Sequence, residues 1–340
     1  MNGDIWNITI KKHITLNAVE NSAAKIISAN SIAVVTRVAV GKLVYMPLEY
    51  ATSQDFISFQ NLSGDHSFFM YLVSKVMHKV RGSLQGTSIK GISKGELLKK
   101  KVIYTLNIKE QKKIGTLLKS LDTILTLYER KLKLLSQAKK YFLDNLFAEK
   151  EYPNLRFKEF TDAWEQRKLG KVATFINGRA YKQNELLDSG KYKVLRVGNF
   201  YTNDSWYYSN LELADKYYID KGDLVYTWSA TFGPHIWDGE KVIYHYHIWK
   251  IELSKFLDRD FTLQILEADK AKLLANTNGS TMIHVTKKDM ESKVISLPII
   301  EEQKQIGLYL TKFDTLIALY ENKQQHLTEI KNTLLNTMFI

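Results

Sequence analysis

Two stretches of the sequence are nearly the same: KEQKKIGTLLKSLDTILTLYERK at residues 109–131 and EEQKQIGLYLTKFDTLIALYENK at residues 301–323. Laid over each other without a gap, residues 108–147 and 300–339 share 17 identities in 40 positions, at a constant offset of 192 residues. Unrelated segments do not agree to this extent, so the chain contains an internal repeat. A repeat of this kind organises a whole fold, and the other features of the sequence are interpreted from it.

The repeated phrase has the apolar period of a coiled coil. Successive apolar positions are four and three residues apart in alternation, which is the 3.5-residue period of a helix seam. Lys139 and Lys331 occupy the same slot of the two copies, and a polar seam residue sets the register of pairing. Each helix is expected to have about 33 residues and a length of about 50 Å at 1.5 Å per residue. The predicted seam comprises Ile114, Leu118, Leu121, Leu125, Tyr128, Leu132, Leu135, Lys139, Phe142 and Leu146, and then Ile306, Leu310, Phe313, Ile317, Tyr320, Gln324, Leu327, Lys331, Leu334 and Met338.

Neither helix can bury its apolar stripe alone, so the two are expected to pair with each other. Parallel pairing would require residues 148–300 to return the chain to the end where the first helix began. Antiparallel pairing requires only that they begin at one end of the rod and finish at the other. We therefore predict an antiparallel pair with a folded lobe at each end. The alternative is that each helix packs only on its own lobe as an ordinary amphipathic helix.

The repeat continues into the segments before the helices. Residues 30–41 (NSIAVVTRVAVG) lie over residues 222–233 (GDLVYTWSATFG) at the same offset, and both are β-rich runs that end in a glycine. The predicted fold class is α+β, with two mixed α/β lobes and two long helices that form an antiparallel coiled coil. The predicted divisions are a first lobe at 1–107, a first helix at 108–150, a second lobe at 151–299 and a second helix at 300–340. Residue 153 of the second lobe has its counterpart at position −39, so we expect the first lobe to lack about 40 opening residues.

Composition favours a polyanionic partner. The chain has 340 residues, no cysteine, 48 Lys and Arg against 36 Asp and Glu, and a formal net charge of +12. Fixed cationic side chains release counterions from nucleic acid on binding, although a basic solvated surface has the same composition. The sequence begins without the pattern of a signal peptide and contains no long apolar run. We therefore expect a cytoplasmic protein that makes no membrane contact.

One segment carries a specific resemblance. Residues 153–170 (PNLRFKEFTDAWEQRKLG) contain Pro153, Leu155, Arg156, Phe157, Phe160, Trp164, Glu165, Leu169 and Gly170 in one spaced pattern. This pattern resembles the opening of the target-recognition domains found in the specificity (S) subunits of type I restriction–modification enzymes. The phrase E-Q-K-x-I-G at Glu110–Gly115 and Glu302–Gly307 is similar to the start of the conserved helices in that family. The resemblance covers the second lobe and both helices, and the first lobe departs from it at its start.

The resemblance implies a subunit without catalytic chemistry. In that family two recognition domains each read half of a split sequence in double-stranded DNA, and the antiparallel helices fix the spacing. The helices also hold two methyltransferase (M) subunits, to which restriction (R) nuclease–translocase subunits are added. S-adenosylmethionine, ATP and Mg are then expected on the partners, with no cofactor on this chain.

The sequence offers no catalytic motif of its own. It contains neither a G-x-x-x-x-G-K-[ST] phosphate loop nor a G-x-G-x-x-G turn. The Glu-x-Lys runs at the helix starts are interpreted as favourable negative charge at a helix N-terminus. His245 and His247 lie in HYHIW, predicted as a strand with both on one face, and His235 is nearby. We predict structural or DNA-facing histidines there rather than a metal site, which needs three or four supported ligands.

Candidate DNA-reading residues are forked donors and amides near loops, together with lysines suited to phosphate contacts. The loop at 177–185 is dense in such groups, and the alternative for it is an ordinary polar turn. Lys287 and Lys288 are assigned to phosphates. The candidates in the second lobe are Arg179, Tyr181, Lys182, Gln183, Arg196, Asn199, Trp228, Thr231, Lys287 and Lys288, and those in the first lobe are Arg37, Lys42, Lys90 and Lys94.

The function predicted from the sequence is a DNA specificity subunit that reads a bipartite duplex target and docks methyltransferase subunits on its coiled coil. Two alternatives stay open. One is a coiled-coil assembly scaffold that does not bind DNA and whose basic charge is incidental. The other is an inactive or recombination-donor copy of a specificity subunit, with a first lobe that is not functional.

Overall fold

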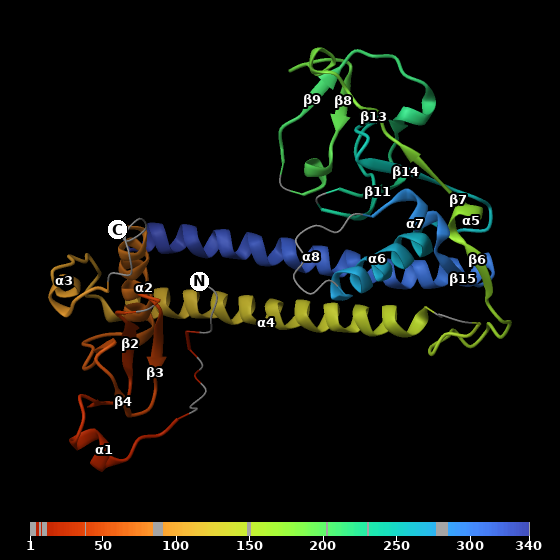
Figure 1. Ribbon diagram of the computed structural model, residues 1–340. Coiled ribbons are helices and arrows are strands. Elements are labelled where there is room, and N and C mark those ends of the chain that lie inside the picture. Colours follow the sequence, from red (N-terminus) through yellow and green to blue (C-terminus); the bar gives the residue numbers. More distant parts are fainter. Residues whose placement is uncertain are drawn as a thin grey trace. The chain divides into compact units, whose positions relative to one another are not determined.

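The chain forms two compact units in a computed structural model that describes residues 5–6, 8, 12–37, 39–83, 91–147, 151–201, 203–229, 231–276 and 285–339 (Figure 1). Unit 1 comprises Met1–Lys133 and Leu319–Ile340, and unit 2 comprises Leu134–Ala318. Each unit therefore contains part of both long helices. The four-part division by residue ranges stays a prediction. Among the described residues, no helix is both long and apolar enough to cross a membrane.

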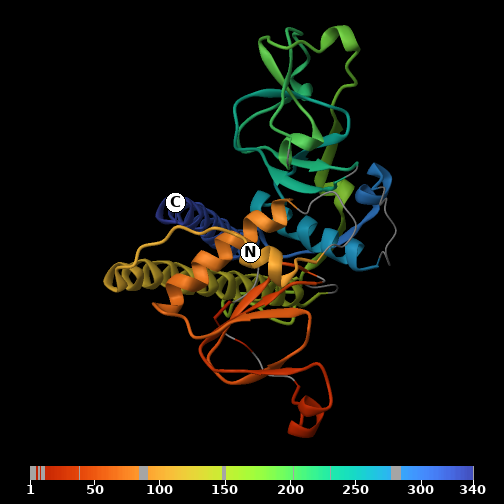
Figure 2. The same cartoon turned by 90° about the vertical axis from the view of Figure 1, so that its left-hand side faces the viewer.

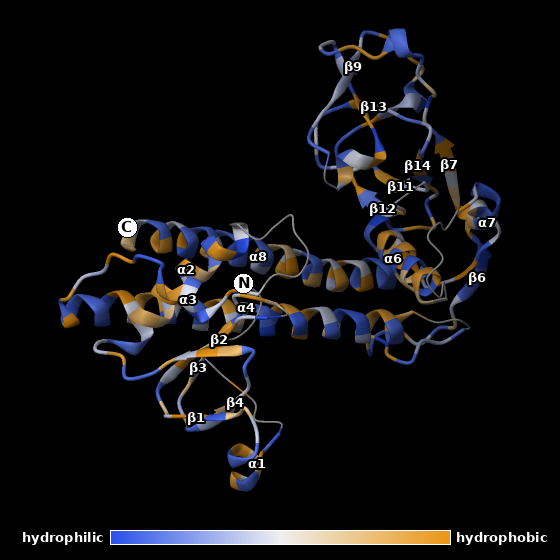
Figure 3. Ribbon diagram, turned by 60° about the vertical axis from the view of Figure 1, so that its left-hand side comes forward, coloured by the Kyte–Doolittle hydropathy of each residue, from blue (hydrophilic) through white to orange (hydrophobic). Residues whose placement is uncertain are grey.

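The two long helices are α4 (Ile108–Leu146) and α8 (Ile300–Met338), with 39 residues each, longer than the 33 expected. In unit 1 the first part of α4 packs on the last part of α8, with Leu118 in one apolar cluster with Leu334. In unit 2 the last part of α4 packs on the first part of α8, and the rings of Phe142 and Tyr309 are 5.0 Å apart. The antiparallel pairing is therefore confirmed within each unit. Figure 3 shows apolar residues recurring along both helices.

The predicted seam matches the burial of the two helices. All ten predicted positions of α4 and all ten of α8 are buried or half-buried. Tyr128 meets Tyr320, its own counterpart in the repeat, with ring centroids 5.6 Å apart. Antiparallel pairing of two copies of one helix requires such a self-contact at its midpoint.

The polar slot of the seam is filled by two ion pairs that are copies of each other. Lys139 pairs with Asp314 in unit 2, and Lys331 pairs with Asp122 in unit 1. Both lysines and both aspartates are related by the offset of 192. Asp122 also accepts a hydrogen bond from Tyr71 (2.6 Å), and Asp314 accepts one from Gln264 (2.8 Å). The lysine that interrupts the apolar stripe thus finds a fixed partner in only one register.

Unit 1 contains a three-stranded antiparallel sheet in the order β3 (Leu43–Met46), β2 (Ser31–Val35) and β5 (Phe56–Phe59). Helix α2 (His66–Ser83) covers one face, and Ile32 and Val34 of β2 share a core with Met70 and Met77 of α2 (Figure 2). The other elements of unit 1 are α1 (Leu16–Glu20), α3 (Lys94–Leu98) and the two-stranded sheet of β1 (Lys25–Ile27) and β4 (Tyr50–Thr52).

Unit 2 contains the corresponding sheet with one more strand. Its order is β12 (Gly233–Ile236), β11 (Leu224–Thr227), β14 (Ile248–Leu253) and β7 (Ala173–Asn177), with α6 (Arg259–Asn276) packed against β12. A second sheet has the order β10 (Tyr218–Ile219), β13 (Val242–Tyr244), β8 (Tyr192–Leu195) and β9 (Tyr207–Ser209). The remaining elements are the pair β15 (Val294–Leu297) and β6 (Glu165–Lys168), the helices α5 (Leu169–Val172) and α7 (Lys287–Ser292), and the 3-10 turns η1 (Gln183–Glu185), η2 (Val197–Phe200) and η3 (Asp215–Tyr217).

The repeat therefore holds at the level of single strands. Ile32 of β2 and Leu224 of β11 are 192 positions apart, and so are Phe56 and Ile248, which open β5 and β14. In both units the central strand of this set pairs with the other two. The two lobes share this three-stranded set, as the sequence predicted, and among the described residues β6, β7, β8 and β9 are strands of unit 2 alone.

Candidate nucleic-acid interface

The same joint fixes each lobe on its long helix. In unit 1 the buried Gln111 accepts a hydrogen bond from the backbone N–H of Asp65 (2.9 Å), and the Asp65 carboxylate caps α2 by accepting from Phe68 N–H (2.9 Å). In unit 2 Gln303 accepts from Asp258 N–H (2.9 Å), and Asp258 accepts from Phe261 N–H (3.0 Å). The glutamine of the E-Q-K-x-I-G phrase therefore holds the start of the lobe's helix in both units.

The glycine of the same phrase permits this approach. A Cβ on Gly115 would lie 2.6 Å from Asp65 Oδ1 and 2.7 Å from Phe68 N. A Cβ on Gly307 would lie 2.6 Å from Phe261 N. Real Cβ atoms do not approach backbone this closely, so any other residue would push the lobe from the helix. The base of each lobe is thereby fixed to the repeat.

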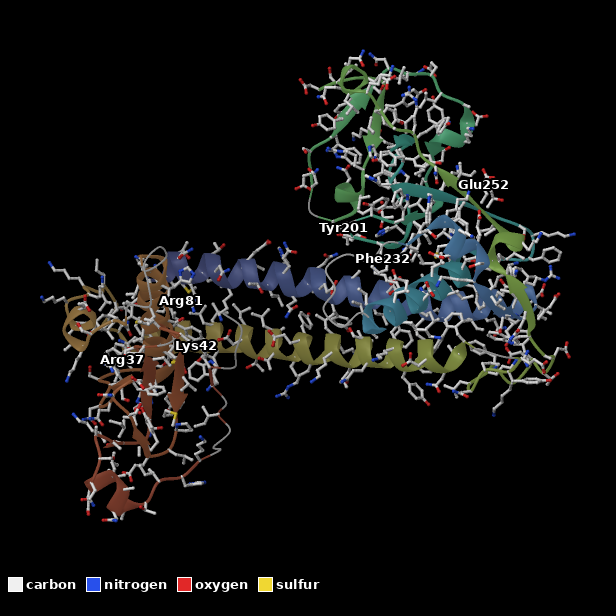
Figure 4. The ribbon with its side chains drawn as sticks, in the orientation of Figure 1. Arg37, Lys42, Arg81, Tyr201, Phe232 and Glu252 are labelled. Atoms are coloured by element: carbon white, nitrogen blue, oxygen red, sulfur yellow. The ribbon has the colours of Figure 1, made fainter. Side chains whose placement is uncertain are left out.

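In unit 1 the hairpin loop between strands β2 and β3 is basic. Arg37 and Lys42 are exposed on the loop between β2 and β3, and Arg37 pairs loosely with Asp55 (3.6 Å). Gly41 in this loop has φ of +87°, and the Arg81 side chain from α2 passes close beside it. Figure 4 shows Arg37, Lys42 and Arg81 gathered in one region. Three cations from two elements there can face a phosphate backbone.

The predicted loop of unit 2 is built around an internal clamp. Arg179 donates two hydrogen bonds to the Glu185 carboxylate (2.8 and 3.0 Å), and its guanidinium lies 5.3 Å from the Tyr181 ring centroid. The clamp lowers the pKa of the Glu185 carboxyl. Lys182 and Gln183 are exposed between these ends. In this conformation Arg179 shapes the loop, and Lys182 and Gln183 are the side chains presented outward.

Arg196 and Asn199 hold a second loop. The Arg196 guanidinium stacks on Tyr207 at 4.3 Å and donates to the carbonyl of Ser205 (3.1 Å). The Asn199 side-chain amide donates to the carbonyls of Asn203 and Ser205 (both 3.0 Å). The Nε of Arg196 is buried, and no acceptor for it is found in the described part of the chain. A base-reading role for these two residues stays a prediction.

The two loops of unit 2 that contain Arg179 and Arg196 both lie beside the turn of residues 245–247. For the second of them, His245 N–H donates a hydrogen bond to Leu195 O (2.9 Å). Arg179 N–H donates to Tyr244 O (3.0 Å), and Tyr246 N–H donates to Arg179 O (3.2 Å). The prediction of a strand through His245 and His247 is wrong: Ile248 N–H bonds to His245 O, which closes a turn, and β14 begins only at Ile248. Burial, with smaller contributions from the neighbouring His247 and Arg196, lowers the pKa of the His245 ring to about 4.

Trp228 lies at this turn as well. Its indole N–H donates to Tyr246 O (2.9 Å), and its ring is stacked on Trp249 at 5.9 Å. Tyr246 itself is 38% exposed. Thr231 is exposed on the loop between β11 and β12. Trp228 therefore supports the turn, and Tyr246 is the aromatic surface that a base can reach there.

The third predicted histidine is separate. His235 on β12 stacks on Phe200 (4.3 Å), and its Nε2 is 3.1 Å from the Tyr201 hydroxyl. Burial lowers its pKa to about 4, so the ring is neutral at physiological pH. Figure 4 shows Tyr201 and Phe232 at one edge of the lobe and Glu252 away from them. Among the described residues, no group of three or more His, Asp or Glu side chains is arranged to hold a metal ion.

The predicted phosphate contacts lie at the starts of two short, equivalent helices. Lys287 opens α7 behind the N-cap Thr286, and Lys94 opens α3 behind the N-cap Ser93. Lys287 pairs with Glu291 at 3.6 Å, and Lys288 and Lys94 are exposed. Lys90 lies outside the described residues.

Arg81, Tyr201 and Tyr246 were not predicted from the sequence. Arg81 belongs to a helix within a basic stretch of the chain, where one basic residue does not stand out from its neighbours. Only the repeat could have pointed to it, because Gly41 and Gly233 are counterparts and each packs on a basic side chain, Arg81 and Lys270 respectively. Tyr201 and Tyr246 could not be distinguished in the sequence from the other aromatic residues, most of which form the core.

Comparison with known proteins gives a consistent result. The family model of the type I restriction modification DNA specificity domain matches residues 1–137 and 161–329. The chain is 26% identical over 176 residues to the type I restriction enzyme EcoBI specificity subunit of Escherichia coli, covering 51% of this chain and 36% of that protein. It is also 26% identical over 197 residues to the MjaVIII specificity subunit of Methanocaldococcus jannaschii, covering 57% of this chain and 46% of that protein. The match thus spans less than half of either relative.

Solved structures share the fold at low sequence identity. The crystal structure of a type I restriction-modification system S subunit from M. genitalium matches 92% of this chain and 83% of that one, with a TM-score of 0.61 and 16% identity. A chain from a structural study of assembly and conformational transition of the type I R-M system matches 93% of this chain and 83% of that one, with a TM-score of 0.56 and 16% identity.

Proposed function

Because the chain belongs to the family of the type I restriction modification DNA specificity domain, we propose that it is the DNA-recognition subunit of a type I restriction–modification complex. In this role it reads a bipartite sequence in double-stranded DNA, one half-site with each lobe. It performs no catalysis itself. S-adenosylmethionine belongs to the methyltransferase partners, and ATP and Mg belong to the nuclease–translocase partners.

The observation that carries this proposal is the duplicated joint between lobe and helix. Gln111 and Gln303 make the same hydrogen bond, and Gly115 and Gly307 permit the same close approach. A chain built in this way presents two similar lobes on two copies of one helix, which suits a target with two half-sites. The net charge of +12 supplies the attraction to the DNA backbone.

The outward faces of the helices support the docking of two methyltransferase subunits. Ile124 and Leu127 of α4 are 38% and 56% exposed, and their counterparts Leu316 and Leu319 of α8 are 41% and 44% exposed. Exposed apolar side chains at repeated positions fit two copies of one partner, each bound to one copy of the helix. The proposal therefore assigns one methyltransferase subunit to each helix.

Helix length provides the direct test. One heptad inserted next to Tyr128 and one next to Tyr320 keeps the apolar seam in register and adds about 10 Å to each helix. At about 3.4 Å per base pair, the spacer between methylated half-sites should grow by about three base pairs. The measurement is a map of methylated adenines after assembly with methyltransferase subunits. An unchanged spacer would contradict the proposal that the helices set the spacing.

Substitutions in the lobe of unit 2 distinguish recognition of the DNA sequence from nonspecific attraction to the DNA backbone. Lys287→Ala and Lys288→Ala should weaken binding to all sequences and each reduce the salt dependence of binding by about one phosphate contact. Arg179→Ala and Arg196→Ala should change which sequence is methylated, either through a base contact or through the loop that each arginine shapes. An equal loss on every sequence for both arginines would assign them to folding alone.

A further inference from the structure

The two long helices are copies of one sequence, but they carry different charges. Helix α4 contains nine Lys and Arg residues against four Asp and Glu residues, a net charge of +5. Helix α8 contains four Lys residues against five Asp and Glu residues, a net charge of −1. The ion pair of the seam is the same in both copies. Pairing of the helices therefore does not account for the five extra cations of α4.

Three of these five extra cations lie at one position of the heptad. Residues spaced by seven lie on one face of a coiled-coil helix. On α4 this position holds, in order, Lys112, Lys119, Thr126, Lys133 and Lys140, and the four lysines, called the lysine stripe below, are exposed. The same position of α8 holds Lys304, Thr311, Ala318, Gln325 and Asn332. One copy of the helix thus has four cations where the other has one.

The lysine stripe is not neutralised within the chain. Among the described residues, the ion pairs of α4 are those of Asp122 and Lys139, and the stripe takes no part in them. Exposed Glu129 lies one turn from Lys133 without pairing with it. Lys119 is 4.4 Å from the centroid of the Trp6 ring, which leaves its charge unchanged. An uncompensated row of cations produces a positive potential that attracts a polyanion.

The spacing of the stripe fits the backbone of a DNA duplex. Lys112 and Lys133, both in unit 1, are 21 residues apart, which is about 32 Å along a helix at 1.5 Å per residue. One turn of B-DNA is about 34–36 Å long, so both lysines can meet the same face of one duplex. This agreement in length favours double-stranded DNA over an acidic protein surface as the partner.

The order of residues along the stripe fits the two grooves as well. A line along the surface of a duplex crosses the two phosphate strands in pairs, because the minor groove is about 6 Å wide and the major groove about 12 Å wide. The stripe has two lysines, then Thr126, then two lysines. Two neighbouring lysines therefore match the strands on either side of the minor groove, and the uncharged Thr126 matches the major groove.

The stripe lies on a different face of α4 from the exposed apolar side chains. At 100° per residue, Ile124 and Leu127 are about 160° and 100° around the helix from Thr126. A methyltransferase subunit that covers Ile124 and Leu127 therefore leaves the stripe accessible. Protein and DNA can bind the same helix at the same time.

We propose that the lysine stripe of α4 binds the phosphate backbone of the double-stranded DNA between the two half-sites, and that α8 has no equivalent track. This inference rests on the proposed function, because it requires the chain to bind a duplex. Contacts to phosphates position DNA without reading its sequence. The stripe therefore adds affinity for any spacer sequence and holds the spacer on the α4 side of the helix pair.

The test compares two triple variants that change the charge equally. The chain is assembled with methyltransferase subunits, and the probe is a duplex that contains its mapped methylation site. The stripe variant retains Lys119, which contacts Trp6, and the control variant removes three exposed lysines of α8. The two variants are Lys112→Gln with Lys133→Gln and Lys140→Gln, and Lys304→Gln with Lys312→Gln and Lys323→Gln. Glutamine and lysine have similar helix propensities, so both variants should fold.

Salt dependence measures the number of phosphate contacts. The stripe variant should reduce the slope of log affinity against log salt concentration by about 2.7, at about 0.9 for each of three contacts. The control variant should change this slope by less than about one contact. Both should methylate the same sequence as the wild type. Equal changes of slope in the two variants would mean that only net charge matters and would overturn the proposal.

Ethylation interference locates the contacts on the DNA. Ethylation of spacer phosphates should inhibit binding of the wild-type complex at positions about one helical turn apart. The stripe variant should lose this inhibition and keep the inhibition at phosphates within the half-sites. Inhibition confined to the half-sites in the wild type would overturn the track and leave the proposed function intact, whereas absence of sequence-specific DNA binding would overturn both.

Assembly provides the remaining check. Size-exclusion chromatography should show that the stripe variant binds methyltransferase subunits as the wild type does. Failure of the stripe variant to assemble, with normal assembly of the control variant, would assign the stripe to an acidic protein surface and would overturn the proposal.

Discussion

Unit 1 and unit 2 contain the same joint between lobe and long helix, but the glutamate of this joint has different surroundings in the two units. The glutamine and glycine of E-Q-K-x-I-G make equivalent contacts in both units. The glutamate is a buried ion-pair partner in unit 2 and an exposed helix-start residue in unit 1. Among the described residues, unit 1 has the attachment of the lobe to its helix without the ion pair that Arg156 and Glu302 form at the base of the lobe in unit 2.

The ion pair between the helices, in contrast, is repeated in both units. Lys139 and Asp314 repeat Lys331 and Asp122, and Tyr128 meets its own counterpart Tyr320. The strands of the lobes differ much more, as at Leu43 of β3 and His235 of β12, which are 192 positions apart. Residues that set the helix register are thus retained where residues of the lobes vary.

The largest expected difference between the units is in the stability lost when Glu302 or its counterpart Glu110 is replaced. Glu302→Ala leaves Arg156 without its carboxylate in a buried site, and loss of one partner of a buried pair costs about 3–5 kcal/mol. Glu110→Ala removes an exposed side chain and should change stability by about 0.5 kcal/mol at most. Urea unfolding followed by tryptophan fluorescence measures both, and Trp164 reports unit 2. Equal losses for the two variants would mean that the units are closed in the same way.

The second difference is a pH dependence of stability that His235 gives to unit 2 and that its counterpart in unit 1, Leu43, cannot give. Because the pKa of His235 is about 4 in the folded chain and 6.5 when exposed, the unfolded state binds more protons between these values. His235 therefore lowers stability as pH falls from 6.5 to 4, by up to about 3 kcal/mol. His235→Leu installs the residue found at Leu43 in unit 1 and should remove this loss.

Urea unfolding of the wild type and His235→Leu at pH 7 and pH 4.5 checks this expectation. His326→Leu, which removes an exposed histidine of α8, is the control and should keep the pH dependence of the wild type. If His235→Leu were as acid-sensitive as the wild type, the buried neutral ring would not be the cause.

The third test asks whether the shared joint is equally tight in both units. Gly115→Ala and Gly307→Ala each place a Cβ within 2.6 Å of the lobe. Overpacking of this kind costs about 1–3 kcal/mol, and we expect similar losses in thermal unfolding for the two variants. Gly82→Ala in α2, where no atom lies within 4 Å of the added Cβ, is the matched control and should be neutral or stabilising. A loss in only one unit would show that the joint is not equivalent.

The pairing of the two long helices could be predicted from the sequence because the seam depends only on the spacing of apolar residues along each helix. The ten positions of each stripe, including the two lysines, are all buried or half-buried in the structure. The role of Glu302 could not be predicted in this way, and its interpretation as helix-start charge was incomplete. Its partner Arg156 is 146 positions away, and only the fold brings them together.

The contacts that the candidate residues make within the chain could not be predicted, for a related reason. Arg179 and Arg196 were selected as forked donors, but whether such a donor faces solvent depends on neighbours such as Glu185 and Tyr207. The strand expected at His245–His247 is a turn closed by the hydrogen bond from Ile248 N–H to His245 O, and the backbone of Arg179, from a distant segment, binds beside it. Loop conformation depends on contacts from distant segments, and local residue pattern does not encode them.

The smallest effect tests the helix register in the two units separately. Lys331 and Asp122 are each 16% exposed, whereas Asp314 in the pair with Lys139 is 42% exposed. Solvent screens a pair more strongly when one member is exposed, so double-mutant cycles should give about 1 kcal/mol of coupling for Lys331–Asp122 and less for Lys139–Asp314. Lys→Met combined with Asp→Asn is suitable, because asparagine still accepts the hydrogen bonds from Tyr71 and Gln264. Equal coupling in both units would mean that exposure does not distinguish them, whereas zero coupling in both would leave the apolar seam and the tyrosine pair to set the register.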